Sequence, residues 1–283
     1  MRIDTLLSAG TTTSFEFFPP KTDAEERALD ATLLDLAHLE PSFVSVTYRG
    51  GASSRQRTFD LVRRLHEQGR VESMAHLTCV HHTVAELTEI LSDYRDAGID
   101  NLMLLGGDPD PARGAVGELR YALELVRLAR EVGEFCIGVA AQPAGHPDSP
   151  DLATDRRRLS EKLAEADFAV TQLFFEVDEW RGLVDELGEL GVDKPVLPGI
   201  MPVTAISSVT RMRDLGGSVP RWLVDRLERA APEGPRAVRA VGVDAATSLC
   251  RDLLAAGAPG LHFYTLNRST ATREIYENLR ADD

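Results

Sequence analysis

Residues 73–105, SMAHLTCVHHTVAELTEILSDYRDAGIDNLMLL, decide the fold that this chain can adopt. The stretch opens on a short apolar run at Ser73–Leu77 and closes on another at Asn101–Leu105. Between the two runs, apolar side chains recur at three- and four-residue spacing, which marks one face of a helix: Leu87, Ile90, Leu91 and Tyr94. Strands that are apolar nearly throughout belong to sheets covered on both faces. The stretch therefore predicts a strand–helix–strand unit of a parallel sheet.

The same alternation runs along the whole chain. The expected strands are Ser14–Phe18, Phe43–Tyr48, Ser73–Leu77, Asn101–Leu105, Phe135–Ala140, Ala169–Phe174, Pro195–Ile200 and Gly260–Tyr264. Each is followed by at least one amphipathic stretch, and eight such units in a chain of this length predict a closed (β/α)8 barrel. A doubly wound open sheet is the alternative α/β architecture, but it has fewer strands as a rule.

We expect residues 1–283 to form a single barrel domain, because no Pro/Ser-rich linker or shift in composition divides the chain. The segment Val219–Ala256 is long enough for two helices where one would complete the repeat. The sequence therefore predicts an extra helix before strand eight.

The composition of the chain disfavours nucleic acids and anionic membranes as binding partners. Lys and Arg total 31 against 45 Asp and Glu, a formal net charge of −14, so there is no basic surplus to bind nucleic acid or an anionic membrane. Three cysteines without a Cys-x-x-Cys motif indicate neither a disulfide framework nor a zinc knuckle. With no long apolar run and no signal-peptide profile, we expect a cytoplasmic monomer or homo-oligomer that acts on small molecules.

In a barrel, the chemistry belongs at the C-terminal ends of the strands. Polar or glycine-rich residues follow the apolar runs at nearly every such end of this chain. Those that we take as candidate site residues are Glu16, Thr47, Tyr48, His76, Gly107, Asp108, Gln142, His146, Gln172 and Arg268.

Glu16 is the strongest candidate for acid–base chemistry. Its neighbours in sequence are Phe15, Phe17 and Phe18, and a carboxylate among phenylalanines would be poorly solvated. Poor solvation favours the protonated form, which a general acid needs near neutral pH. The alternative is a glutamate that only pairs with an arginine.

Asp108 and Gln172 each allow two interpretations. Asp108 follows two glycines and precedes a proline, which suits a tight turn, but its carboxylate could also hold the N–H groups of a heterocycle. Gln172 interrupts an apolar strand, so its amide must find partners and is more typical of a ligand contact than of a structural one.

Other chemistries lack their motifs. His76, Cys79, His81 and His82 are close in sequence, but strand alternation sends them to different faces, so we expect no metal site. The chain has no G-x-G-x-x-G, G-x-x-x-x-G-K-[ST] or G-x-S-x-G motif, which disfavours Rossmann, P-loop and hydrolase-elbow functions.

Taken in order, these elements resemble the methylenetetrahydrofolate reductase family over nearly the whole chain. The segments that carry the resemblance are Ser14–Pro20 (SFEFFPP), Phe43–Tyr48 (FVSVTY), Ala75–Cys79 (AHLTC), Gly107-Asp108, Thr171–Phe175 (TQLFF), Leu197–Val203 (LPGIMPV) and His262–Arg268 (HFYTLNR). Each segment alone is weak, but their order and spacing are specific.

The resemblance implies a (β/α)8 barrel that reduces 5,10-methylenetetrahydrofolate to 5-methyltetrahydrofolate with NAD(P)H, a CH–NH oxidoreduction that feeds methionine synthesis. It implies that Glu16 is the general acid that generates the 5-iminium cation. By the same resemblance Asp108 and Gln172 contact the pterin, Arg268 lies near the aminobenzoyl-glutamate, and Thr47 lies near the plane of hydride transfer. The residues it places on the cofactor side are Thr47, Tyr48, His76, Gly107, Gln142, His146 and Met212.

Most members of this family carry FAD, and here several FAD contacts are altered. Gly106 replaces the family's arginine, Arg49 enters a loop of small residues, and Gln142 replaces an aromatic residue. The segment Lys162–Phe168 is one residue shorter than the family pattern. Each lost charge-assisted contact would weaken binding about tenfold to a hundredfold. The matching flavin-side positions that remain are His76, Tyr121, His146, Asp155 and Lys162.

We therefore expect a flavin-independent reductase in which NADH delivers hydride directly to the folate. The alternative is the same reaction through bound FAD in a ping-pong mechanism. A non-catalytic folate-binding paralogue or subunit is the alternative from another class, and a coenzyme-F420-dependent barrel reductase is a third.

Overall fold

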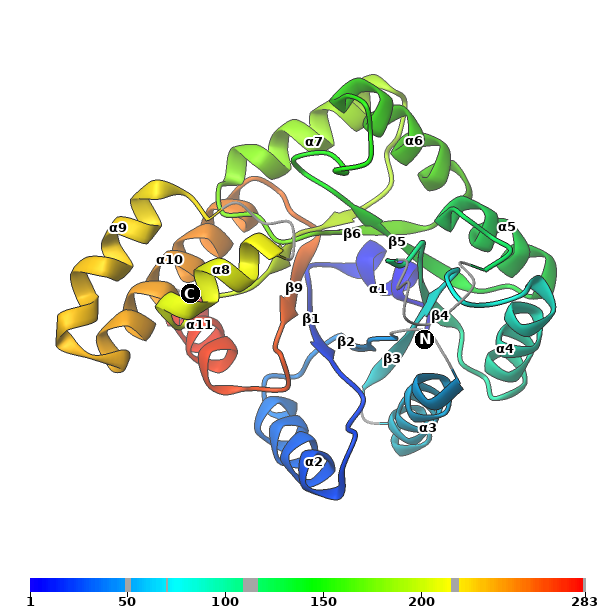
Figure 1. Ribbon diagram of the computed structural model, residues 1–283, viewed down its shortest axis with the longest axis horizontal. Coiled ribbons are helices and arrows are strands. Elements are labelled where there is room, and N and C mark those ends of the chain that lie inside the picture. Colours follow the sequence, from blue (N-terminus) through cyan, green and yellow to red (C-terminus); the bar gives the residue numbers. More distant parts are fainter. Residues whose placement is uncertain (49–51, 70, 109–116, 215–218, 282–283) are drawn as a thin grey trace.

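Parallel strands close into a ring, and helices surround it on the outside (Figure 1). The computed structural model describes residues 1–48, 52–69, 71–108, 117–214 and 219–281. The strands are β1 (Thr12–Phe17), β2 (Phe43–Val46), β3 (Glu72–Thr78), β4 (Asn101–Leu105), β5 (Cys136–Ala141), β6 (Phe168–Thr171), β7 (Val196–Leu197), β8 (Gly199–Ile200) and β9 (Gly260–Tyr264). Their hydrogen-bonded order is β7-β6-β5-β4-β3-β2-β1-β9-β8.

The seventh barrel position is divided into β7 and β8 by Pro198, which has no N–H to donate to a neighbouring strand. β7 pairs with β6 and β8 pairs with β9, so the two halves join opposite ends of the sheet. The carbonyl of Pro198 still accepts a hydrogen bond from the His262 amide at 3.0 Å. The nine short strands therefore make the eight-position barrel that the sequence predicts.

Gly199 allows tight packing at the closing point of the barrel, which is where β6, β8 and β9 meet. The Tyr264 hydroxyl donates to the Thr171 carbonyl at 2.6 Å, and the Gly199 amide donates to Thr171 Oγ1 at 2.9 Å. A Cβ at Gly199 would lie 2.3 Å from the Thr171 carbonyl oxygen and 2.6 Å from the Tyr264 hydroxyl. Only glycine leaves room for both hydrogen bonds.

Helices follow the strands in the expected alternation. They are α1 (Ile3–Ala9), α2 (Asp23–Ala37), α3 (Ala52–Gln68), α4 (Val84–Asp96), α5 (Ala122–Val132), α6 (Leu152–Glu165), α7 (Val177–Glu189), α8 (Ile206–Asp214), α9 (Arg221–Ala230), α10 (Pro235–Ala255) and α11 (Thr270–Arg280). Helix α4 buries Leu87, Ile90, Leu91 and Tyr94, the positions that predicted it. Among the described residues, no helix has the length and apolar character that a membrane crossing requires.

Helices α8, α9 and α10 all lie between β8 and β9, which confirms the extra helical segment predicted before strand eight. Together with α11 they gather on one side of the barrel, as Figure 1 shows in yellow, orange and red. Apolar residues of α8, α9 and α10 form a cluster with Leu173 and Phe175, which follow β6. This cluster brings the extra helices close to one strand end.

Helix α1 is an element that the sequence analysis did not predict. Ile3 and Leu7 pack in one cluster with apolar side chains from inside the barrel: Phe43, Met74, Met103, Cys136, Phe168, Val170 and Leu197. The Ile3 amide donates to Asn101 Oδ1 at 2.9 Å, beside the start of β4. Figure 1 shows α1 within the outline of the ring. The helix therefore closes the N-terminal end of the barrel, which leaves the opposite end for ligands.

Candidate active site

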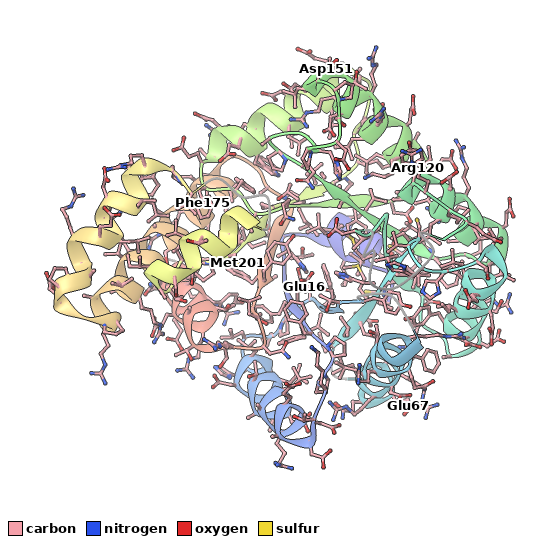
Figure 2. All side chains as sticks on the ribbon, in the orientation of Figure 1. Glu16, Glu67, Arg120, Asp151, Phe175 and Met201 are labelled. Carbon is pink, nitrogen blue, oxygen red and sulfur yellow. The ribbon has the colours of Figure 1, made fainter. Side chains whose placement is uncertain are left out.

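Glu16 lies near the C-terminal end of β1 and faces the inside of the barrel. Alternation along the strand sends Phe15 and Phe17 outward into the main core between sheet and helices. Figure 2 shows Glu16 near the middle of the ring, whereas Glu67, Arg120 and Asp151 lie at the periphery. The phenylalanines that flank Glu16 in sequence are therefore on the other face of the strand, and other residues surround the carboxylate.

Two histidines surround it instead. Glu16 Oε2 lies 3.5 Å from His76 Nε2 on β3 and 3.6 Å from His262 Nε2 on β9. All three side chains are largely buried, and that of Glu16 is 13% exposed. The structure thus brings the predicted residues Glu16 and His76 together and adds His262, to which the sequence analysis assigned no role of its own.

Burial decides the charge of the groups beside Glu16. Burial lowers the pKa of His76; the Glu16 carboxylate opposes that shift and His262 adds to it. Burial also raises the pKa of Tyr264 well above its usual value, with the Glu16 carboxylate adding to the effect. His76 and Tyr264 are therefore both neutral near pH 7.

The loop after β9 connects Arg268 to the end of β1. Asn267 Oδ1 accepts from the Phe18 amide at 2.7 Å, and its Nδ2 donates to the Phe18 carbonyl at 2.9 Å. The Thr265 hydroxyl donates to the Glu16 carbonyl at 2.6 Å. Arg268 follows directly and is exposed, with its own amide bound to the Thr265 carbonyl at 2.9 Å. Thr265 and Asn267 therefore fix where Arg268 stands relative to Glu16.

Thr47, Gly107 and Asp108, which the sequence analysis predicts as site residues, follow the ends of β2 and β4. Thr47 follows β2, and its buried Oγ1 has no hydrogen-bond partner among the described residues. Gly107 has φ of 81° and lies so close to Val80 and Thr78 that a Cβ would meet them at 2.5 and 3.0 Å. Asp108, next along the chain, is exposed. The glycine lets the backbone turn there and direct Asp108 away from the strand.

Gln172 follows β6 directly and is half-buried. Its amide donates to the Ala141 carbonyl at 2.8 Å, which extends the pairing of β6 with β5. Its Oε1 accepts from the Leu173 amide at 2.9 Å. Its Nε2 amide donates to none of the described residues, so both N–H bonds can be offered to a ligand.

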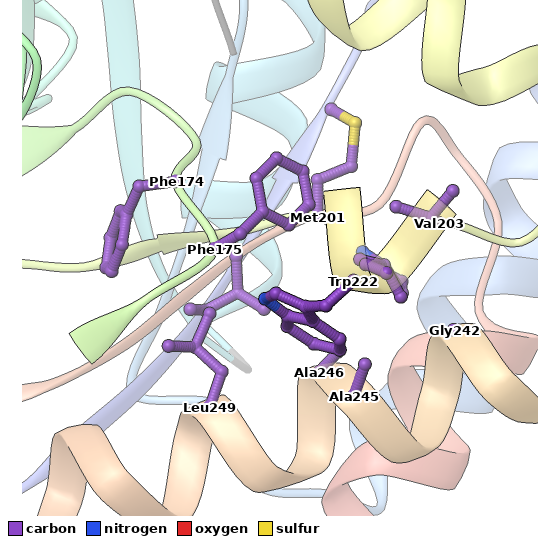
Figure 3. A pocket seen from close by; sticks show the side chains of 12 residues that line it. Phe174, Phe175, Met201, Val203, Trp222, Gly242, Ala245, Ala246 and Leu249 are labelled. Carbon is purple, nitrogen blue, oxygen red and sulfur yellow. The ribbon is translucent and has the colours of Figure 1, made fainter. Parts of the chain in front are cut away.

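A small apolar cavity adjoins this strand end (Figure 3). It is lined by residues such as Phe174, Phe175, Met201 and Trp222, and its volume is about 20 Å³. That volume has room for one water at most. The cavity is a gap in the packing against α9 and α10, and it is far too small for a folate.

A group of possible metal donors lies at the opposite end of the barrel. One ligand atom from each of Asp4, Cys136 and Asp167 falls within 4.8 Å of the others. Arg2 pairs with Asp4 at 2.8 Å and Arg130 pairs with Asp167 at 2.9 Å, and burial raises the pKa of the Cys136 thiol to about 12. The carboxylates are thus neutralised by arginines, which accounts for the cluster without a metal.

Comparison with known proteins identifies the family. The sequence profile of the methylenetetrahydrofolate reductases matches residues 2–280. The 5,10-methylenetetrahydrofolate reductase of Pectobacterium carotovorum is 35% identical over 268 residues, covering 94% of this chain and 89% of that protein. The Escherichia coli K12 enzyme of the same name is 34% identical, covering 94% and 90%. The chain belongs to the methylenetetrahydrofolate reductase family.

Members of this family are oxidoreductases that reduce methylenetetrahydrofolate to methyltetrahydrofolate, and this chain is such an enzyme. A solved structure supports the fold. A Clostridium thermocellum protein, described as binding two copies of 5-methyl-5,6,7,8-tetrahydrofolic acid, superposes with a TM-score of 0.70 at 15% identity. The alignment covers 100% of this chain and 98% of that one.

The positions that the sequence analysis predicts on the cofactor side are spread over several environments. Tyr48 packs in the core outside the barrel, where its hydroxyl lies 2.5 Å from His82 Nε2. Met212 is buried in the α8–α10 cluster. His146 is exposed, and Gln142 is half-buried with its carbonyl bound by Arg156 at 2.9 Å. Arg49 lies outside the described residues.

Two cationic groups on α6, Lys162 and Arg156, have partners within the protein. Lys162 Nζ donates to the Ala140 carbonyl at 2.7 Å, and burial lowers the pKa of Lys162 to about 8, against the opposing effect of Asp155. Arg156 is 4% exposed and binds Glu186, Asp155 and the carbonyls of Gln142 and Pro143. Arg156 is therefore held by several protein groups, and Lys162 donates one of its three N–H bonds to a carbonyl.

Proposed function

We propose that this reductase uses NADH as its direct hydride donor and Glu16 as the general acid. The observation that carries the proposal is the position of Glu16: a carboxyl inside the barrel, at the end that α1 leaves open, beside neutral His76. A general acid must hold its proton until the substrate takes it, and surroundings without a nearby fixed cation favour this.

The proposed mechanism begins with ring opening. Glu16 transfers its proton to N10 of 5,10-methylenetetrahydrofolate, the bond from N10 to the methylene carbon breaks, and the electrophilic 5-iminium cation forms. NADH supplies a hydride that converts this cation to the 5-methyl product. Asp108 and Gln172 hold the pterin by hydrogen bonds, and Arg268 provides positive charge for the glutamate carboxylates.

The residues that remain on the flavin side do not fit a tightly bound FAD. Charge-assisted contacts to its diphosphate would come from cations such as Lys162 and Arg156, and both already donate to carbonyl or carboxylate groups of the protein. Asp155 likewise accepts from the His146 amide at 3.0 Å and the Ser149 hydroxyl at 3.1 Å. These contacts give the retained residues a structural role in the loop after β5. They support a flavin-independent enzyme.

The proposal extends to the protein as a whole. We infer that residues 1–283 act as one reductase domain with small-molecule substrates only, in the cytoplasm, and that the product feeds methionine synthesis.

The deciding experiment measures NADH oxidation by methylenetetrahydrofolate with protein freed of flavin, with and without added FAD. We expect full activity without FAD and no stimulation by it. Activity only with FAD would replace the proposal by a ping-pong flavoenzyme. Glu16→Gln is the companion variant, which should retain folate binding and lose turnover; surviving turnover would exclude Glu16 as the acid.

A further inference from the structure

The His262 ring is held on three sides. Its Nδ1 lies 2.8 Å from Ser14 Oγ, its neighbour across the β1–β9 pairing. Phe43 stacks on the ring at 6.0 Å with an interplanar angle of 19°, and Tyr264 meets it edge-on at 5.4 Å and 87°. With 1% of the side chain exposed, the ring has one fixed orientation. In that orientation its Nε2 faces the Glu16 carboxyl.

Ser14 determines which ring nitrogen carries the proton. Its hydroxyl oxygen lies 2.8 Å from His262 Nδ1 and also 3.3 Å from the Leu261 carbonyl, to which it donates. A hydroxyl has a single proton, so it can serve both contacts only by donating to the carbonyl and accepting from Nδ1–H. A neutral imidazole with its proton on Nδ1 has a lone pair on Nε2. That lone pair points toward Glu16.

We propose that Ser14 and His262 are positioning residues that keep Glu16 protonated until substrate arrives. The inference rests on the proposed role of Glu16 as the general acid. The Nε2 lone pair accepts the hydrogen bond of the protonated carboxyl and would face a carboxylate unfavourably, so it favours the acid form. The gap of 3.6 Å between Nε2 and Oε2 closes to a hydrogen bond with a small rotation of the carboxyl.

The proton balance of the step is simple. In the resting enzyme the O–H of Glu16 points to His262 Nε2. When substrate binds, the carboxyl turns, the O–H bond breaks as the N10–H bond forms, and Glu16 is left as a carboxylate. It recovers a proton from water before the next turnover.

The other groups around Glu16 do not compete for this role. His76 on β3 faces the same carboxylate oxygen at 3.5 Å, and burial keeps it neutral. Tyr264 on β9 is a neutral phenol, and its O–H donates a hydrogen bond to the Thr171 carbonyl. Ser45, in register with Glu16 on β2, carries no charge. Among the described residues, the ion-pair contacts of Glu16 are with the two histidines alone.

Two substitutions at position 262 separate the Ser14 contact from the Glu16 contact. The amide of His262→Asn occupies the position of Nδ1 and keeps a donor for Ser14, but nothing remains to face Glu16. The longer His262→Gln places its amide oxygen near Nε2 and can accept from Glu16. Ser14→Ala keeps the imidazole and removes the group that selects its tautomer.

The test is the pH profile of kcat between about pH 6 and 9. For His262→Asn we expect the alkaline limb to move to lower pH by about one unit, so that kcat falls roughly tenfold at the alkaline end and changes little at the acid end. KM for the folate should stay within about twofold. His262→Gln should restore most of the shift, and Ser14→Ala should show a smaller shift in the same direction.

A loss of kcat by the same factor at every pH would mean that His262 only supports the fold, and would overturn the inference. An unmoved profile would overturn it too. If Glu16→Gln is inactive and the His262→Asn profile does not move, this inference fails while the proposed function stands. Because substitutions in the barrel can impair folding, ¹⁵N NMR of the histidine rings in the unaltered protein provides a second test. The proton of His262 should be on Nδ1, and a proton on Nε2 would exclude the proposal.

Discussion

Replacing Gly199 by alanine should destabilise the barrel at its closing point. The added Cβ would lie 2.3 Å from the Thr171 carbonyl oxygen and 2.6 Å from the Tyr264 hydroxyl, so backbone must move. Overpacking of this kind costs about 1–3 kcal/mol. Two buried hydrogen bonds, from Tyr264 and from the Gly199 amide to Thr171, would be strained or lost at about 1 kcal/mol each. The free energy of unfolding should therefore fall by about 2–5 kcal/mol.

Urea denaturation followed by circular dichroism measures this loss. Gly182→Ala is the matched control, because Gly182 lies in α7 with no atom within 4 Å of an added Cβ. Alanine there should stabilise the protein by about 0.5–1 kcal/mol. Equal stabilities of Gly199→Ala and the unaltered chain would refute the role assigned to the closing point. Folate turnover should also fall in Gly199→Ala, since Tyr264 packs against His262.

Two further substitutions test the site and its surroundings. Asn267→Ala removes both side-chain hydrogen bonds to Phe18 and places alanine at φ of 58°, so the free energy of unfolding should fall by about 2–3 kcal/mol and KM for the folate should rise. Asn267→Gly removes the backbone strain of the alanine variant but does not restore the two hydrogen bonds, so it should recover only part of the stability. Full recovery would contradict the role of the Asn267 side chain. Lys162 has an ordinary pKa of 10.5 that burial lowers to about 8, so between these values the unfolded chain binds more protons and stability should rise with pH. In Lys162→Met this rise should be smaller by about 1–2 kcal/mol; the value is discounted for solvent screening because the side chain is partly exposed. Urea titrations at several pH values measure the rise. An identical dependence of stability on pH in both proteins would contradict the lowered pKa of Lys162.

Much of the barrel could be predicted from periodicity because each strand and helix carries its own local signal. The apolar stripe of α4 is an example, since the four residues that define it are the ones that the structure buries. Helix α1 has only seven residues, too few for a helical period to stand out. Its burial depends on side chains that come from six strands, β2 to β7. The division of the seventh strand at Pro198 follows from the missing N–H, but the pairing of its halves with different neighbours is a property of ring closure.

The site shows the same division between local and long-range information. The sequence analysis expected Glu16 to be surrounded by phenylalanines, but Phe15 and Phe17 point to the opposite face of the strand, as alternation along a strand requires. The residues that do surround it, His76 and His262, come from strands far away in the sequence. Strand register decides that Ser14 stands beside His262, and register cannot be read from one strand alone. The roles of Asp108, Gln172 and Arg268 remain predictions.

The pairing of β1 with β9 has a consequence for how the enzyme is made. Ser14 and His262 are separated by 248 positions, so β1 has no β9 to pair with until these later residues have been translated. Contacts of such long range make folding slow. The backbone of Glu16 and Phe18 also depends on Thr265 and Asn267, which are translated later still. A nascent chain that lacks β9 therefore contains Glu16 but not the residues that surround it.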